Sequence, residues 1–283
     1  MQFLGDINTD KDLSGGTRVG DWLVLVSDES RSVILMQSQG NAYAHVGTVE
    51  LLAGEKEFDL EGVAADGDIV YVCGSHSAVR KQLAGQIGHI KFRPNCDVVF
   101  RFRLKTDGTI RDIDQRSLRQ AIDTHDVLAP FAHLASKENG IDIEGLACRD
   151  GKLYFGFRGP VLRDNWVPVM VSGFDKPNGN DVRYVQRGGR GICDLVDVSD
   201  GILVLAGPSG DGEEGYRLWH WNGVCGLASP DDCKLKPLTG LPAEPIGKLE
   251  GLILLKEKSG RYELLLLSDG PRGGNPTRIV VER

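Results

Sequence analysis

The amino-acid sequence predicts an all-β protein, and three of its features support that fold class. Glycine accounts for 37 and proline for 12 of the 283 residues, so residues that favour turns are abundant. Five segments repeat one pattern, in which a short apolar run, a turn and a strongly apolar run follow one another. Helix-compatible spacing is confined to residues 115–136, where Pro130 interrupts it. An all-helical protein is therefore excluded.

Each repeated segment is expected to begin with two antiparallel strands. Asp-Gly or Ser-Gly between apolar runs is a strong hairpin signal, because these residues accept the positive φ that tight turns demand. Such pairs occur at Asp66-Gly67, Asp150-Gly151, Asp200-Gly201 and Ser259-Gly260. Further strand-like runs follow the pairs, namely Ser32–Met36, Val98–Leu104, Val167–Val171 and Arg217–Trp221.

The spacing of the segments predicts a β-propeller that spans residues 1–283 as one domain. Equivalent positions fall at residues 15, 62, 145, 195 and 251, in steps of 47, 83, 50 and 56 residues. A four-stranded propeller blade takes about 40–50 residues, so five blades fit, and the 83-residue step leaves room for a sixth. The helical stretch reads as an insertion on the rim. Gln2–Leu4 and Thr277–Val281 are both available to complete the last blade.

Charge and composition exclude some partners. Lysine and arginine number 33 against 40 acidic residues, and the net charge of −7 argues against binding to nucleic acid or to anionic lipid. The chain has no run of 18 apolar residues and no signal-like N-terminus, so we expect a soluble, cytoplasmic protein without a membrane partner. The periplasm is the alternative if a signal was removed. The oligomeric state is left open.

The six cysteines do not form a recognisable metal-binding pattern. No C-x-x-C pair is present, so a structural zinc site has no support. Cys73, Cys148 and Cys193 lie in apolar runs, where cysteine is usually a small buried hydrophobe. Cys225 and Cys233 flank a short loop, and whether they form a disulfide stays open.

In a propeller, the first strand of each blade lines the channel and starts on the face where the second strand ends. Side chains from different blades should therefore converge at one end of the channel. The inner strands start at Ser14, Glu61, Glu144, Asp194 and Glu250. The second strands end one shell further out, at Asp28, His76, Arg158, Ser209 and Asp269.

Four carboxylates at one narrow opening predict a divalent-cation site. Carboxylate oxygens favour calcium or magnesium, so the candidate metal ligands are Glu61, Glu144, Asp194 and Glu250. The alternative is structural, with each acid accepting hydrogen bonds from backbone N–H groups of the neighbouring blade. These two interpretations have equal weight.

His76 and Arg158 are the candidate catalytic residues. His76, between two serines, is a candidate general base or phosphate contact, although a lone loop histidine is more often structural. Arg158 follows an apolar strand and either holds a substrate anion or pairs with one of the acids. Four cations follow on the connection after His76, and we expect either a solvated loop or an anion contact: Arg80, Lys81, Lys91 and Arg93.

Three groups of motifs resemble a bacterial β-propeller family classified as a domain of unknown function, DUF3616. They are Leu60–Ala64 with Gly74–Ser77, Ile143–Ala147 with Gly156–Pro160, and Arg190–Leu195 with Ala206–Pro208. The resemblance spans residues 14–270 and implies a propeller. More distantly, Glu-Gly at the start of inner strands is similar to calcium-dependent lactonase and esterase-like phytase propellers. In the lactonases an acid there binds the metal, but the asparagines that complete that site have no counterpart here.

The functional hypothesis is a propeller whose channel opening binds a divalent cation together with a small anionic or ester ligand. Its catalytic form is a metal-assisted esterase, phosphoesterase or lactonase, in which His76 is the base and Arg158 holds negative charge. The alternative is a non-catalytic ligand-binding or scaffold propeller in which the acids only connect the blades. Serine-hydrolase chemistry has little support, because no G-x-S-x-G motif is present.

Overall fold

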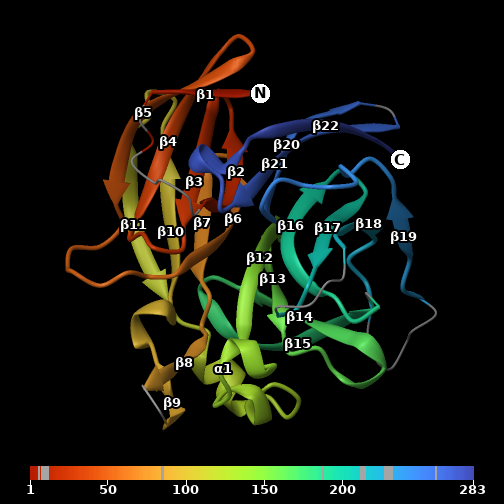
Figure 1. Ribbon diagram of the computed structural model, residues 1–283. Helices are drawn as coiled ribbons and strands as arrows, with labels where there is room; N and C mark the ends of the chain where they lie inside the picture. Colours follow the sequence, from red (N-terminus) through yellow and green to blue (C-terminus); the bar gives the residue numbers. More distant parts are fainter. Residues whose placement is uncertain are drawn as a thin grey trace.

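The computed structural model is a ring of five β-sheets around a central channel (Figure 1). It describes the chain except residues 6, 8–12, 84–85, 187, 211–214, 226–231 and 259. The inner strands of the five sheets contact one another in cyclic order, and the first contacts the last. A cavity of about 160 Å³ lies along this axis and is lined by all five inner strands. The predicted five-bladed propeller is confirmed, and no sixth blade occupies the 83-residue step.

The first two blades follow the predicted order of strands. The first sheet contains β2 (Leu13–Val19), β3 (Trp22–Ser27), β4 (Ser32–Gln39) and β5 (Ala42–Glu50), with β1 (Gln2–Leu4) on its outer edge. The second contains β6 (Leu60–Asp66), β7 (Ile69–Gly74), β10 (Val99–Leu104) and β11 (Ile110–Arg116).

In the described part of the chain, the third and fourth blades have four strands each, and the fifth has three. The third contains β12 (Asp142–Arg149), β13 (Lys152–Gly159), β14 (Trp166–Gly173) and β15 (Lys176–Gln186). The fourth contains β16 (Gly191–Val198), β17 (Gly201–Gly207), β18 (Arg217–Trp221) and β19 (Leu235–Leu238). The fifth has three strands, β20 (Lys248–Lys258), β21 (Arg261–Asp269) and β22 (Thr277–Glu282).

Two insertions explain the 83-residue step. The hairpin β8 (Ala78–Leu83) and β9 (Gln86–Phe92) separates β7 from β10, and the short helix α1 (Arg119–Thr124) follows β11. Both project from one end of the ring, at the bottom of Figure 1. The helical stretch predicted for residues 115–136 is shorter than expected, because β11 extends to Arg116 and only six residues are α-helical.

The core consists of the five junctions between neighbouring blades. Each junction has its own cluster of buried apolar side chains, and the cluster between the fifth and first blades includes Leu23, Ile34, Leu265 and Leu267. Alternation along each strand directs apolar residues to both blade faces, which are both covered by neighbours. Packing between blades therefore closes the ring and places the starts of the inner strands at one end.

The glycines of the repeat are required by the close approach of neighbouring inner strands. A Cβ atom on Gly62 would lie 2.8 Å from the backbone nitrogen of Leu146, and one on Gly15 would overlap the carbonyl oxygen of Glu61. Gly145 approaches the backbone of Asp194 in the same way. Each of these glycines thus packs against the next blade near its acidic residue.

One strand assignment from the sequence is wrong. Gln2–Leu4 was expected to complete the last blade together with Thr277–Val281, but β1 pairs in parallel with β5 of the first blade. Only β22 belongs to the fifth blade, where it pairs with β21. Among the described residues, no helix is long and apolar enough to cross a bilayer.

Candidate functional site

The acids at the starts of the inner strands gather at one end of the channel, called the mouth below. Glu61, Glu144 and Glu250 lie at the starts of β6, β12 and β20, and Asp142 precedes Glu144 on β12. The side chains of Glu144 and Glu250 are only 6% and 14% exposed. These four acids and Arg158 are called the mouth cluster.

Arg158 provides the positive charge within this cluster. It lies near the end of β13, and its Nη1 atom is 2.6 Å from Oε1 of Glu144 and 3.9 Å from Oε1 of Glu250. Its Nε donates a hydrogen bond to the carbonyl oxygen of Pro208 at 3.2 Å. Of the two roles that the sequence left open, this geometry corresponds to the internal ion pair.

One arginine does not neutralise four buried carboxyl groups. Burial, and then the charge of Glu144, raise the pKa of Glu61 well above its usual value. The pKa of Glu250 is also raised well above its usual value by burial and by Glu144, although Arg158 opposes that shift. Burial and Glu144 act on Asp142 in the same direction. The mouth cluster therefore retains protons that isolated carboxyl groups lose.

Asp194 has a different role from the other three predicted ligands. Its Oδ1 accepts a hydrogen bond from the backbone N–H of Leu195 at 2.8 Å, and its Oδ2 accepts one from Leu252 at 2.7 Å. Leu252 belongs to β20 of the next blade. Asp194 therefore connects the fourth and fifth blades, as the structural interpretation of the acidic ring predicted.

His76 is fully buried and has no free ring nitrogen. Its Nδ1 is 2.9 Å from the carbonyl oxygen of Gly74, and its Nε2 accepts the backbone N–H of Leu118 at 3.1 Å. Burial lowers its pKa to about 4. These contacts argue against the predicted role of general base, because no ring atom is available to a substrate. His76 instead fixes the start of the segment that contains α1.

Sequence reasoning missed an ion pair beside His76. The two terminal guanidinium nitrogens of Arg93, Nη1 and Nη2, donate hydrogen bonds to Asp59, and Nη2 also donates to Oγ of Ser77 at 2.6 Å. Arg93 was considered only as a loop cation, and no local signal in the sequence identified Asp59. Another loop cation, Arg80, forms a surface ion pair with Glu138.

The residues present do not fit a calcium or magnesium site. One oxygen of Glu144 binds the guanidinium of Arg158, and both oxygens of Asp194 accept backbone N–H groups. A hard cation requires several free oxygens around one point. Within the part of the chain that the structure describes, no group of three or more His, Cys, Asp and Glu side chains is arranged to hold a metal ion.

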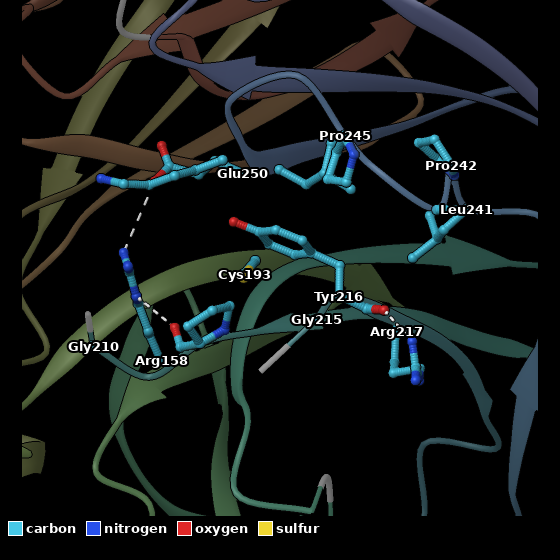
Figure 2. A pocket seen from close by; sticks show the side chains of 14 residues that line it. Arg158, Cys193, Gly210, Gly215, Tyr216, Arg217, Leu241, Pro242, Pro245 and Glu250 are labelled. Carbon is cyan, nitrogen blue, oxygen red and sulfur yellow. Dashed lines mark hydrogen bonds and ion pairs between the residues drawn. The ribbon is translucent and has the colours of Figure 1, made fainter. Parts of the chain in front are cut away.

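A cavity of about 460 Å³ opens beside the mouth, between the fourth and fifth blades (Figure 2). Arg158 and Glu250 line it where it meets the mouth cluster, and Arg217 and Lys248 add two further cations. The ring of Tyr216 extends between Glu250 and the loop that contains Pro242 and Pro245 (Figure 2). This space, called the side cavity, is large enough for a small organic molecule.

The match to a family model assigns this chain to a family. The family described as "Protein of unknown function (DUF3616)" matches residues 12–92 and 104–280. The chain belongs to the DUF3616 family. The resemblance inferred from the blade motifs is therefore confirmed, and a search of the curated proteins finds no match.

Solved structures similar to this DUF3616 chain share its fold. Glutaminyl cyclase of Myxococcus xanthus is 12% identical over 97% of this chain and 92% of its own, with a TM-score of 0.50. A PQQ-bound aldose sugar dehydrogenase of Streptomyces coelicolor is 12% identical over 96% and 94%, with a TM-score of 0.47. A glycosyl hydrolase of Bacteroides ovatus is 11% identical over 96% and 84%, with a TM-score of 0.44. At these identities the likeness shows the fold alone.

The side cavity of the DUF3616 chain contains residues that the sequence did not single out. Tyr216 immediately precedes β18, Arg217 begins β18, and Lys248 begins β20 two residues before Glu250. Their type and spacing carry no motif. They reach one cavity only because the blades rotate β18 and β20 toward the same side of the mouth.

Proposed function

We propose that this chain binds a small organic anion in the side cavity, with the acidic head of the ligand toward Arg158 and Lys248. The charge of the lining supports this proposal. Among the described residues of the lining, Arg158, Arg217 and Lys248 are cations and Glu250 is the carboxyl group. Arg158 is paired with Glu144, and Lys248 lies 3.4 Å from Asp269, so a bound anion shares or replaces these partners. A predominance of cations in a partly enclosed space favours an anion.

The protonation of Glu250 strengthens the preference for an anion. Because burial and the charge of Glu144 raise its pKa well above the usual value, Glu250 holds its proton to a higher pH than an isolated glutamate does. A protonated carboxyl group donates a hydrogen bond and does not repel an incoming carboxylate or phosphate. The head of the ligand is thus recognised by the cations and by the acid form of Glu250.

An apolar surface covers the other side of the cavity and selects the body of the ligand. The side chains on this surface are Tyr216, Leu241, Pro242, Ala243, Pro245 and Leu249. Such a surface gains free energy by covering a hydrocarbon or an aromatic ring, at about 25 cal/mol per Å² of apolar area. We therefore expect amphiphilic anions, such as aromatic or branched carboxylates and phosphomonoesters, to bind more tightly than inorganic phosphate.

A catalytic role is the second candidate, and it rests on the position of Glu250. A protonated carboxyl group in a cavity wall is suited to donate a proton to a leaving oxygen, as a general acid. Hydrolysis of an ester or phosphoester by this route depends on neither His76 nor a divalent cation. Metal-assisted hydrolysis has less support, because both oxygens of Asp194 accept backbone N–H groups and one oxygen of Glu144 binds Arg158.

The proposal is tested by ligand-dependent thermal stability, because a molecule that binds only the folded chain raises Tm. Benzoate and phenyl phosphate are the anionic probes, and benzyl alcohol is their neutral counterpart. A separate series of measurements uses calcium with and without chelator. We expect the two anions to raise Tm, and benzyl alcohol, calcium and chelator to leave it unchanged. Titration calorimetry then gives the affinity.

Substitutions in the cavity locate the binding site. Lys248→Gln and Arg217→Gln should each weaken anion binding roughly tenfold, since a hydrogen bond to a charged group contributes about 1.5–3 kcal/mol. Lys236→Gln, on an exposed position of β19, is the matched control and should bind as the parent does. If no anion raises Tm, or if the control loses affinity equally, the proposal fails; a Tm increase with calcium would restore the metal hypothesis.

A further inference from the structure

The strand β22 is the outer edge of a blade that is incomplete compared with the others. Among the described residues, the other four blades have at least four strands, whereas the fifth sheet consists of β20, β21 and β22. The N-terminal strand β1, which could have provided a fourth strand, pairs with β5 instead. An edge strand presents unpaired backbone groups and readily pairs with another strand.

The backbone geometry shows which residues of β22 carry the outward groups. The N–H of Arg283 donates to the carbonyl oxygen of Gly260 at 2.9 Å, and this pair continues the register of β21 with β22. Hydrogen-bonded and non-hydrogen-bonded positions alternate along an antiparallel pair. The odd-numbered residues of β22 therefore bond to β21, and residues 278, 280 and 282 direct their N–H and C=O groups outward.

The side chains of the same three residues are exposed. Arg278, Val280 and Glu282 share the solvent face of β22, and Val280 is 51% exposed. The loop at Gly240 approaches the carbonyl oxygen of Val280 and the side chain of Val281, which is fully buried on the opposite face. The loop thus reaches the carbonyl oxygen of Val280 from the buried face of the strand, whereas the Val280 side chain is open to solvent on the other face.

The charges on this edge are complementary to themselves. Arg278 and Glu282 lie two residues on either side of Val280, so an antiparallel second copy centred on Val280 places each Arg278 opposite Glu282 of that copy. The two Val280 side chains then face each other. Each of these positions carries outward backbone groups, so about six hydrogen bonds can join the two strands.

Neighbouring ion pairs extend the match. On the same sheet Arg278 binds Glu263 at 2.6 Å, and Glu282 binds Arg261 at 2.9 Å. Across the symmetric junction, Glu263 and Arg278 of one copy are followed by Glu282 and Arg261 of the second copy. The charges along this row of four side chains alternate in sign. Charged side chains usually protect an edge strand against pairing, but on this edge the charges of two antiparallel copies are opposite in sign.

From these observations we infer that two copies of this chain form a symmetric dimer by antiparallel pairing of their β22 strands. The pairing supplies the fifth blade of each copy with its fourth strand. The contact is centred on Val280 and flanked by two Arg278–Glu282 pairs between copies. Because one short strand buries a small area, the dimer is of the weak, concentration-dependent class.

The test is sedimentation velocity over roughly 5–500 µM, the range expected for a small interface. The parent chain should shift from monomer to dimer as its concentration rises. Arg278→Glu and Glu282→Arg each place like charges opposite one another, so each variant alone should dimerise at least about tenfold more weakly. An equimolar mixture of the two variants should form a heterodimer, because one edge is then acidic and the other basic.

Two further variants make the result decisive. The double variant R278E/E282R restores opposite charges across the junction but places like charges beside Glu263 and Arg261 on its own sheet, so it should dimerise more tightly than either single variant. Arg111→Glu, on the exposed edge strand β11, should have no effect. Unchanged Tm and circular dichroism establish that the variants are folded. A parent that stays monomeric, a dimer that neither single change weakens, or a mixture that stays monomeric would each overturn the inference.

Discussion

Buried His76 illustrates how the surroundings of one residue decide its role. In sequence, a histidine between two serines after a strand has the features of a general base. In the fold its ring is enclosed, Nδ1 contacts the carbonyl of Gly74 and Nε2 accepts the N–H of Leu118. Only the neutral imidazole can donate at one nitrogen and accept at the other. The contact with Leu118 comes from an insertion 42 residues away, which no local pattern reveals.

The burial of His76 makes unfolding pH-dependent. Its folded pKa, about 4, is below the usual 6.5, so the unfolded chain binds more protons between these values. The contribution of His76 is complete above pH 6.5 and is lost as the pH falls toward 4. It amounts to at most about 3 kcal/mol. We expect His76→Asn to flatten the dependence of the unfolding free energy on pH in this window, as measured by urea denaturation.

The control for this experiment is His133→Asn. His133 is exposed and lies in the insertion that contains Leu118 and α1. Asparagine tolerates the positive φ of 54° that His76 adopts, so the substitution does not strain the backbone. Equal pH dependence of the parent and the His76 variant between pH 4 and 6.5 would contradict the prediction.

Arg158 and Glu144 should be energetically coupled. Arg158→Met leaves the buried Glu144 without its counter-ion, and we expect a loss of roughly 2–3 kcal/mol, less than for a fully dry pair because Glu144 can take up a proton. The double variant R158M/E144Q should lose less than the sum of its two single variants. Urea denaturation at pH 7 measures this cycle, with Arg217→Met as the control. Additive losses would show that the pair is not coupled.

At the scale of strands, the Glu-Gly pairs of the repeat have two separate purposes. The acid faces the mouth, and the glycine allows the next inner strand to approach closely. In Gly62 no positive φ is involved; the constraint is the backbone of Leu146 and Glu144 on the neighbouring blade. The repeated motif therefore reflects the packing between blades as well as any chemistry at the mouth.

This packing predicts a difference between two glycines in strands. Gly62→Ala should destabilise the chain by about 1–3 kcal/mol, because its Cβ would lie 2.8 Å from a backbone nitrogen and the strands must separate. Gly173→Ala, at the end of β14 where a Cβ meets no atom within 4 Å, should be neutral or slightly stabilising. Thermal and urea unfolding check both values. A neutral Gly62→Ala would show that the inner strands are not close-packed.

For the whole molecule, local turn chemistry was sufficient to predict the architecture. The turns and apolar runs predicted two strands of each blade, and their spacing favoured five blades while leaving room for a sixth. The partner of β1 was not predictable, because the edges of two blades were equally suitable from the pattern alone. The side cavity could not be predicted either, because its position depends on how far each blade is rotated about the channel.

The cysteines show the same limit of prediction from sequence. The free thiols of Cys73, Cys148 and Cys193 are buried, as their apolar runs predicted. Cys225 and Cys233, which the sequence left open, form a disulfide that closes the connection between β18 and β19. Trp221 at the end of β18 donates its indole N–H to the sulfur of Cys225 at 2.8 Å. Sequence spacing allowed this bond, but only the hairpin geometry brings the two sulfurs together.

The position of β1 affects how the ring of blades is closed. Because β1 lies on the first blade, no sheet of the described residues contains strands from both ends of the chain. The described contacts across the seam between the first and last blades include packed apolar side chains and a hydrogen bond from Arg18 to the carbonyl oxygen of Leu255. The other four junctions are also bridged by covalent connections between successive blades. The seam has no such tether, so opening fluctuations should begin there and spread outward to the rest of the ring.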